Sequence, residues 1–539
     1  MQAEAVQQAV EHLTPIIIGV FFAALVVALT AVARRLPVPT PILQVAAGLA
    51  IALIPSVRIP VLEPDLVFFV FLPPVLWAAA YFTPLREFKA NIRPIGSLAV
   101  GLVLATSAAV AIVARMLIPG MPWAVAVALG AIVSPPDAVA AEAILTRLPV
   151  PRRITVILEG ESLVNDASAL ILYRTAVAAA VTGVFSWGES IVRFFIDAGI
   201  GSLIGLLVGW LIVRGARLTK DALAETLLTL AGPYLAWTVA ETLHVSAVLA
   251  CVAGGLFLGQ QLSTAVSPVS RIETRMVWQL VVFLLNALIF IVLGAEFGSM
   301  LRGESARTLG FALRTGLVIG LVAIVVRLLW VPIWTLIPRE RGRRRRRGEE
   351  PEPSRAPYRR KALFLVGWTS MRGIVSLASA LSLPQLLGSG APFPFRTEII
   401  LIAMCVILMT LVFQGLTLAP VIRAFRFPPD ATELEEETLA RREALRRGAE
   451  ALEDMSREPW VDRRDVEWLR AELRDRARLA EHHGGGPAAR RRLRAGMITA
   501  ERRILVRLRN EGAISDEVLR ELEQELDLEA IRAGAGDAR

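Results

Sequence analysis

A cluster of polar and acidic residues interrupts one of the longest apolar stretches of the chain. Residues 154–181 are otherwise almost all apolar, long enough for a tilted helix to cross a ~30 Å hydrocarbon core. The run from Glu161 to Asp166, which reads ESLVND, lies within this stretch. A charge at the bilayer centre costs at least ~2.5–3.5 kcal/mol, so an acidic residue there is a functional site by default. This segment therefore favours ion or proton handling.

The composition is typical of a protein with many membrane-spanning helices. Of 539 residues, 55% are hydrophobic, and the mean hydropathy is +0.56. Cys251 and Cys405 both lie in apolar runs, so neither a disulfide framework nor a thiolate metal site is indicated. The sequence has no nucleotide-binding loop, nucleophile–base set or metal cluster, and we expect neither an enzyme nor a cofactor. The net charge of +9 favours an anionic lipid surface over nucleic acid as a partner.

Apolar runs bounded by charge or proline predict thirteen membrane crossings. They are residues 15–33, 41–57, 66–82, 95–118, 123–145, 154–181, 191–213, 223–241, 245–262, 276–298, 309–338, 361–386 and 398–421. Lys and Arg favour cytoplasmic loops. An outer N-terminus and a cytoplasmic C-terminus place every strongly basic loop inside, including the run Arg343–Arg347. We expect that orientation, with anionic headgroups gathered near this run.

The composition changes abruptly near Pro428. Residues 428–539 are rich in Arg, Glu, Ala and Leu, which predicts a cytoplasmic helical tail beside a transmembrane domain of residues 1–427. Ser515 precedes two acidic residues, a pattern typical of a helix start. Residues 482–487 (HHGGGP) indicate a linker.

Three predicted crossings carry an ionisable residue at a similar depth. Counted from the end at which each segment enters, Asp166 lies about 18 Å deep, Asp137 about 20 Å and Arg372 about 16 Å, at ~1.5 Å per residue. Each depth is near the middle of a ~30 Å core. Chance placement would scatter such residues or gather them at the ends, so the pattern indicates a midplane site.

Two of these crossings are predicted to be broken. Pro135 and Pro136 lack N–H donors and free the carbonyls one turn earlier, and the run from Gly367 to Gly373 (GWTSMRG) is polar and flanked by glycine. Irregular backbone at membrane depth is tolerated only inside protein or beside water. Broken helices at matching points of two oppositely oriented halves, here segments 4–6 and 11–13, indicate the site of a transporter with inverted repeats.

Several of these residues also have a purely structural interpretation. The Pro135-Pro136 pair taken alone is more typical of a simple kink. Arg372 either contacts the ion or stabilises the C-terminus of a helix. Asp137 is expected at the positive N-terminus of the second half-helix, a dipole role rather than a ligand role. Glu142 has no assigned role.

Asp166 has few structural alternatives, and its chemistry follows from competition at one carboxylate. When ionised, it binds a monovalent cation together with Ser162, one turn earlier, and the carbonyls freed by the prolines. When protonated, a form that burial favours, it releases the cation. If the protein reorients only with Asp166 neutralised, exchange is obligatory. Asn165 orients the site by a hydrogen bond without adding a titratable charge, so one proton per cation is the simplest stoichiometry.

The combined motifs resemble the monovalent cation–proton antiporters, in particular the bacterial sodium/proton exchangers of the electroneutral branch. Matching runs occur in the same order over most of the apolar part of the chain. They are Phe71–Pro74 (FLPP), Ser134–Val139 (SPPDAV), Glu159–Ala167 (EGESLVNDA), Phe283–Asn286 (FLLN), Met371–Leu377 (MRGIVSL) and Gln414–Leu418 (QGLTL).

The resemblance implies an all-α membrane fold of thirteen helices, with a mobile core of segments 4–6 and 11–13 and a dimerisation domain of the remaining segments. It implies a homodimer in the bacterial plasma membrane that exchanges Na⁺, or Li⁺ or K⁺, for H⁺ by alternating access. By motif match, Asp166 is the shared carrier, Glu161 and Ser162 are its companions, and Arg372 balances charge. The Asn165-Asp166 pair is the mark of the electroneutral branch.

The chain departs from the family pattern at two places. Many relatives have Thr-Asp-Pro where this chain has Pro136-Asp137-Ala138, so a threonine ligand is missing and other carbonyls or a water complete the cation shell. Many relatives carry a glutamate on segment 3 where this chain has Ala78. We therefore expect Arg372 to pair with Glu161 instead.

Two other functions would use the same features. A cation channel or a pH-sensing membrane protein would use the same acidic site, although the sequence has no filter-like repeat. A signalling or scaffold protein would need the membrane part only as an anchor, and thirteen crossings exceed that need. In an exchanger, we expect the tail to set the pH response or the oligomeric state.

Overall fold

Helices form all the regular structure of the described residues, apart from one isolated β-bridge between Leu386 and Pro392. The structure is a computed structural model. It describes residues 19–54 (except 34 and 37), 68–183 (except 147), 187–265 (except 220), 268–336, 356–427 (except 388 and 389), 431–481 and 488–532 (except 512 and 514). Three features of the sequence lie outside these residues: the run Arg343–Arg347, the linker 482–487 and the outer ends of the first three predicted crossings.

The helices belong to two compact units, Met1–Pro429 and Asp430–Arg539. The helices of the first unit are Gly19–Ala33, α2 (Thr40–Ala52), α4 (Leu72–Phe82), α5 (Leu85–Ala90), α6 (Ile92–Gly96), the π-helix η1 (Ser97–Leu102), α7 (Val103–Leu117), α8 (Trp123–Val133), α9 (Ala138–Leu145), α10 (Arg152–Thr182), α11 (Trp187–Thr219), α12 (Ala222–Thr242), α13 (Ala247–Ala265), α14 (Pro268–Gly303), α15 (Ala306–Leu336), α17 (Ala356–Trp368), α18 (Ile374–Leu381) and α19 (Arg396–Phe425). Those of the second are α20 (Ala431–Met455), α21 (Arg463–Glu481), α22 (Ala488–Asn510) and α23 (Asp516–Arg532).

Every predicted crossing overlaps a described helix or a pair of short helices. Five described helices are long and apolar enough to cross a membrane by length and composition. They are Ile92–Leu117, Phe195–Thr219, Ser270–Gly303, Ala306–Ile333 and Arg396–Phe425. The predicted all-α fold is therefore confirmed, and the number of crossings remains a proposal.

Proline chemistry explains the first of two breaks in the helices. α8 ends at Val133 and α9 begins at Ala138, and two prolines without N–H donors lie between them. The Asp137 side chain caps α9, because its Oδ1 accepts a hydrogen bond from Val139 N at 2.9 Å. The second break separates α17, which ends at Trp368, from α18, which begins at Ile374. Both breaks occur where the sequence indicated them.

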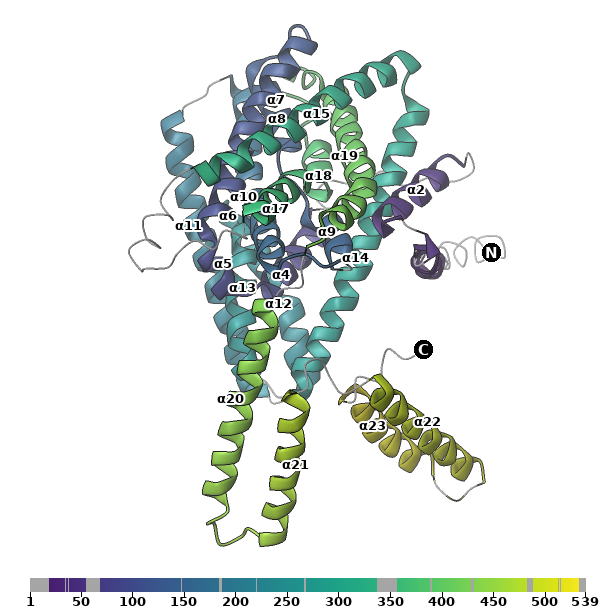
Figure 1. Cartoon of the computed structure of the whole chain (residues 1–539). Coiled ribbons are helices and arrows are strands. Elements are labelled where there is room, and N and C mark those ends of the chain that lie inside the picture. The colour runs from purple at the N-terminus through teal and green to yellow at the C-terminus, as the bar shows by residue number, and fades with distance from the viewer. Residues whose placement is uncertain are drawn as a thin grey trace, which may run out of the picture. The chain divides into compact units, whose positions relative to one another are not determined.

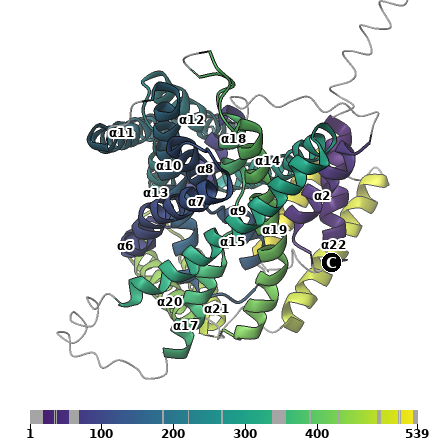
Figure 2. The same cartoon turned by 90° about the horizontal axis from the view of Figure 1, so that it is seen from above.

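The helices of the first unit pack in two groups. The first helix group consists of Gly19–Ala33, α2, α4 and α11–α14, and the second consists of α5–α10 with η1, α15 and α17–α19. Contacts within each group are dense, as between α11 and α13 or between α15 and α19, and contacts across the groups are fewer. Figure 1 and the view from above in Figure 2 show α8, α9, α10 and α18 gathered together within this unit.

The second unit consists of two helical hairpins. α20 packs against α21, and α22 packs against α23 (Figure 1). Ion pairs link the helices of each hairpin, as between Arg470 and Glu453 at 2.7 Å and between Arg494 and Glu529 at 3.0 Å. The predicted helix start at Ser515 is confirmed, because α23 begins at the next residue and Val518 N donates to Ser515 Oγ at 3.3 Å.

Candidate ion-binding site at two broken helices

The two broken helices touch each other at their breaks. Asp137 N, between α8 and α9, donates a hydrogen bond to the carbonyl of Met371, between α17 and α18, at 2.6 Å. Arg372 N donates to Thr410 Oγ1 of α19 at 3.2 Å. Backbone groups that the breaks remove from helical pairing are thus paired with each other or with a neighbouring helix, as burial requires. The crossing is therefore a fixed feature of the fold.

Asp137 lies where the N-termini of two half-helices meet. It caps α9 directly, and its carboxylate also lies against Gly373, the residue before α18. A Cβ added at Gly373 would overlap with this carboxylate, so only glycine fits there. The two helix N-termini favour a negative charge at this place. This geometry agrees with the expected dipole role of Asp137.

Arg372 is buried, with 1% of its surface exposed, and its donors are directed at carbonyl oxygens. Its Nε donates to Val133 O, at the C-terminus of α8, at 3.0 Å, and its Nη1 donates to Ser370 O and Ser370 Oγ. A cation at a helix C-terminus stabilises the exposed carbonyls and the dipole. Of the two roles left open by the sequence, this geometry matches the structural one.

The expected pairing of Arg372 with Glu161 is wrong, because Glu161 of α10 pairs with Arg327 of α15. Arg327 Nη2 lies 2.7 Å from Glu161 Oε2, and Arg327 Nη1 bonds Glu161 Oε1, so the guanidinium holds both carboxylate oxygens. Both side chains are only 1% exposed, and Arg327 Nε donates to Val366 O at 3.1 Å. Glu161 therefore has a bidentate partner of its own.

Sequence reasoning missed Arg327, although a signal for it was present. Arg327 lies deep inside the apolar segment 309–338, whose other charge, Arg314, lies near its start, and a charge at that depth needs a partner inside the membrane. Several acidic residues lie within the predicted crossings, and each was a possible partner. Depth along a helix did not select among them, because depth says nothing about which face of the helix a side chain occupies.

Asp166 differs from every other charged group at this site because it has no paired partner. Its side chain is buried on α10, with 7% exposed, and no described residue forms a hydrogen bond or ion pair with its carboxylate. Burying an ionised carboxylate without a partner is costly, so the group favours either a bound cation or a proton. Among the described residues no group of three or more His, Cys, Asp or Glu is placed to hold a metal ion.

The neighbours of Asp166 on α10 connect it to the first break. Asn165 is fully buried, and its Nδ2 donates to the carbonyl of Pro136 at 2.9 Å, while its Oδ1 has no hydrogen-bond partner among the described residues. Ser162 lies one helical turn before Asp166 and is half-buried. Glu142, which the sequence left unassigned, is exposed on α9.

The carbonyls near Pro135 and Pro136, expected to complete a cation shell, already accept hydrogen bonds from the protein. Ala131 O accepts from Ser134 Oγ at 3.2 Å, and Pro136 O accepts from Asn165. A carbonyl has two lone pairs, so each retains capacity for one further contact. Both prolines are buried, Gly367 belongs to the last turn of α17, and the break begins after it.

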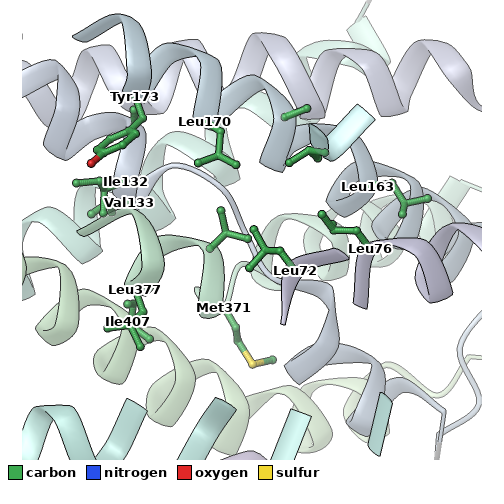
Figure 3. Packing of buried hydrophobic residues seen from close by; sticks show 14 of the residues in the cluster. Leu72, Leu76, Ile132, Val133, Leu163, Leu170, Tyr173, Met371, Leu377 and Ile407 are labelled. Atoms are coloured by element: carbon green, nitrogen blue, oxygen red, sulfur yellow. The ribbon is translucent and has the colours of Figure 1, made fainter. Parts of the chain in front are cut away.

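Apolar side chains surround the crossing. Figure 3 shows Leu163 and Leu170 of α10, Ile132 of α8, Met371 between the half-helices and Leu377 of α18, all members of one buried cluster. This surrounding lowers the local dielectric, which strengthens electrostatic interactions at the site. One unpaired acid among apolar residues, beside a fully neutralised ion pair, can exchange one positive charge for another.

The sequence of the chain is similar to known proteins over most of its length. The model of the transmembrane sodium/hydrogen exchanger family matches residues 21–424. The chain is 32% identical to an uncharacterized Na⁺/H⁺ exchanger of Mycobacterium tuberculosis (strain ATCC 25618 / H37Rv), with 96% of each chain covered. It is 33% identical to the sodium, potassium, lithium and rubidium/H⁺ antiporter of Bacillus subtilis (strain 168), over 71% of this chain and 57% of the relative.

A solved structure has the same fold. The sodium proton antiporter MjNhaP1 of Methanocaldococcus jannaschii, at pH 8, superposes with a TM-score of 0.57. The superposition covers 78% of this chain and 99% of the antiporter, at 18% sequence identity. At that identity the likeness concerns the fold alone.

Proposed function

The chain belongs to the sodium/hydrogen exchanger family of monovalent cation–proton antiporters, and on that premise we propose that it exchanges a monovalent cation for a proton through Asp166. The observation that carries this proposal is the contrast among the buried charges near the two breaks, all in the second helix group. Glu161, Arg327 and Arg372 are each satisfied by protein partners, whereas Asp166 is buried without one. Asp166 is therefore the group whose charge a transported ion must balance.

The proposed chemistry is competition between two occupants of one carboxylate. Ionised Asp166 binds the cation with oxygen ligands from Ser162, Asn165 Oδ1 and main-chain carbonyls near Pro136, since hard monovalent cations favour oxygen. Protonation of Asp166 removes its charge and releases the cation. Glu161 supports the site as the counter-ion of Arg327 rather than as a ligand, because Arg327 holds both of its oxygens. Na⁺ is the expected cation, with Li⁺ or K⁺ as further substrates.

Obligatory exchange requires that the site reorients only when Asp166 is neutralised. A bare carboxylate crossing an apolar layer costs several kcal/mol, whereas a cation–carboxylate pair or a carboxylic acid crosses more easily. The amide of Asn165 adds no titratable group, so one proton per cation, an electroneutral exchange, follows. The other acids at the crossing have fixed counterparts for a negative charge, because Glu161 pairs with Arg327 and Asp137 lies at a helix N-terminus.

The two helix groups supply the moving parts of this proposal. The second helix group carries both broken helices and α10, and we assign it the role of the mobile core. The first helix group is assigned the fixed role, including the contacts of a homodimer. The thirteen crossings are placed in the bacterial plasma membrane with the N-terminus outside and the tail, residues 428–539, in the cytoplasm. The few contacts between the groups support movement of one past the other.

The direct test is transport by purified protein in proteoliposomes with the membrane potential clamped. Wild type should dissipate an imposed pH gradient when Na⁺ is added, and Asp166→Asn should abolish this response because an amide neither titrates nor carries charge. Ser168→Ala is the matched control, since Ser168 is a buried residue on the same helix whose hydroxyl donates only to Val164 O. Full exchange by Asp166→Asn would refute the proposal, and net current under the clamp would indicate a channel instead.

A further inference from the structure

Among the residues that the structure describes, an ion pair joins the two helix groups. Arg174 of α10, in the second group, has its Nη2 2.6 Å from Glu241 Oε1 of α12, in the first group. The buried ion pair of α10, Glu161–Arg327, lies within the second group. Any movement of one group past the other must therefore break or stretch the Arg174–Glu241 pair.

The pair lies beyond Asp166 on the side away from the predicted cytoplasm. Arg174 follows Asp166 by eight residues, about 12 Å along α10 at ~1.5 Å per residue. Glu241 lies in the last turn of α12. Arg152 lies at the opposite end of α10, as its first residue, and pairs with Glu87 of α5. The Arg174–Glu241 pair therefore lies at the predicted outer end of both helices.

An apolar cluster joins the two helix groups nearer to the crossing. It consists of Phe71, the residue before α4, with Ile289 of α14 and Ala378 of α18, and all three are buried. Ala378 lies one turn beyond Ile374 on the half-helix that leads away from α17. The cluster therefore lies on the same side of the crossing as Arg174 and Glu241, between the groups.

We propose that the Arg174–Glu241 pair and the Phe71–Ile289–Ala378 cluster form an outer gate that separates Asp166 from the external side and must open in each transport cycle. This inference rests on the proposed function, which assigns one helix group to move. The apolar cluster excludes water and ions from the path, because nothing in it solvates a cation. The partly exposed ion pair holds the outer ends of α10 and α12 together.

The Arg174–Glu241 ion pair is weak enough to open and close in each transport cycle. The pair is about half exposed on the arginine side, with exposed fractions of 55% and 38%. Ion pairs at such positions change an equilibrium only by about two- to fivefold. A contact of that size biases the closed state without locking it. Glu241→Gln should therefore raise the outward-open fraction by about two- to fivefold, without abolishing exchange.

Cross-linking tests whether the gate must open. In a background in which the two native cysteines, both buried, are replaced by alanine, Arg174→Cys and Glu241→Cys are combined. A membrane-impermeant bifunctional methanethiosulfonate that spans the length of the original pair then joins them from outside. Exchange in proteoliposomes should stop on cross-linking and return when a reductant cleaves the link. Full exchange by the cross-linked protein would overturn the gate.

Two controls separate the gate from general damage. Arg193→Cys with Asp197→Cys places the same link across an ion pair that lies within α11, near its predicted outer end and inside the first helix group, and should leave exchange unchanged. The doubly substituted gate variant must also exchange before the reagent is added. If it does so but Asp166→Asn also exchanges fully, the proposed function fails while the gate result stands on its own.

Accessibility of the apolar cluster tests its part independently. Ala378→Cys is fully buried in the closed gate, so an impermeant maleimide added outside should label it slowly. Adding Glu241→Gln to this variant should raise the labelling rate about two- to fivefold. Swapping the two charges instead, with Arg174→Glu and Glu241→Arg, should keep the labelling rate near its starting value. An unchanged rate in all three backgrounds would overturn the proposal.

Discussion

The buried pair between Glu161 and Arg327 should behave in opposite ways when one or both partners are replaced. Each side chain is 1% exposed, so removing either one leaves its partner charged, dehydrated and unpaired. Glu161→Leu or Arg327→Met alone should lower the free energy of unfolding by about 3–5 kcal/mol. The double variant replaces the pair with apolar groups, and such replacements are neutral or stabilising by about 1–4 kcal/mol. The double variant should therefore be more stable than either single variant.

This prediction is tested by a double-mutant cycle on the free energy of unfolding in mixed detergent micelles, followed by tryptophan fluorescence. The exposed pair between Arg174 and Glu241 is the control, since single substitutions there should cost at most about 1 kcal/mol. Independent sites add to within about 0.3–0.5 kcal/mol. Additive losses at Glu161 and Arg327 within that margin would refute the argument that they neutralise each other. Because Glu161 is not assigned as a ligand, the double variant should also retain exchange.

Three further changes test the crossing and the unit boundaries. Gly373→Ala should abolish exchange and lower expression, because the added Cβ overlaps the carboxylate of Asp137. Gly303→Ala is the control, since its added Cβ meets no neighbour and should leave both intact. Radiolabelled Na⁺ uptake and the yield of purified protein are the measurements. Asn165→Ala should cost about 1–3 kcal/mol of stability through the orphaned carbonyl of Pro136, visible as a lower apparent melting temperature in detergent. Removal of residues 430–539 should preserve exchange, since the compact first unit contains every site residue, but should shift the pH profile of exchange. Loss of exchange would refute this division of the chain. An unchanged pH profile would remove the proposed regulatory role of the tail.

The sequence was sufficient for those features that covalent chemistry determines. Pro135 and Pro136 cannot donate to a helix, so a break near residue 134 follows from composition alone. Ser515 before two acidic residues likewise predicted the start of α23. The position of Asp137 at the N-terminus of α9 follows from the same logic, because a carboxylate after a break is well placed to cap the next half-helix.

The sequence did not predict which buried charges pair with each other. Depth along a helix is fixed by the residue count, but the partner of Glu161 depends on how α10 is rotated and on which helix faces it. Arg372 and Arg327 were both within the membrane part, and only packing places Arg327 against Glu161 and turns Arg372 toward Val133 O. Hydrophobic periodicity did not resolve this, because neither α10 nor α15 has a clear division into one apolar and one polar face.

The central claim is that one carboxylate holds either a cation or a proton, and proton release tests it most directly. Purified protein in weakly buffered detergent, at a pH where Asp166 is protonated, is titrated with Na⁺ while a pH indicator is followed. The account predicts release of about one proton per bound cation by wild type and none by Asp166→Asn. Equal proton release by the two proteins, or Na⁺ binding by wild type without any release, would contradict it.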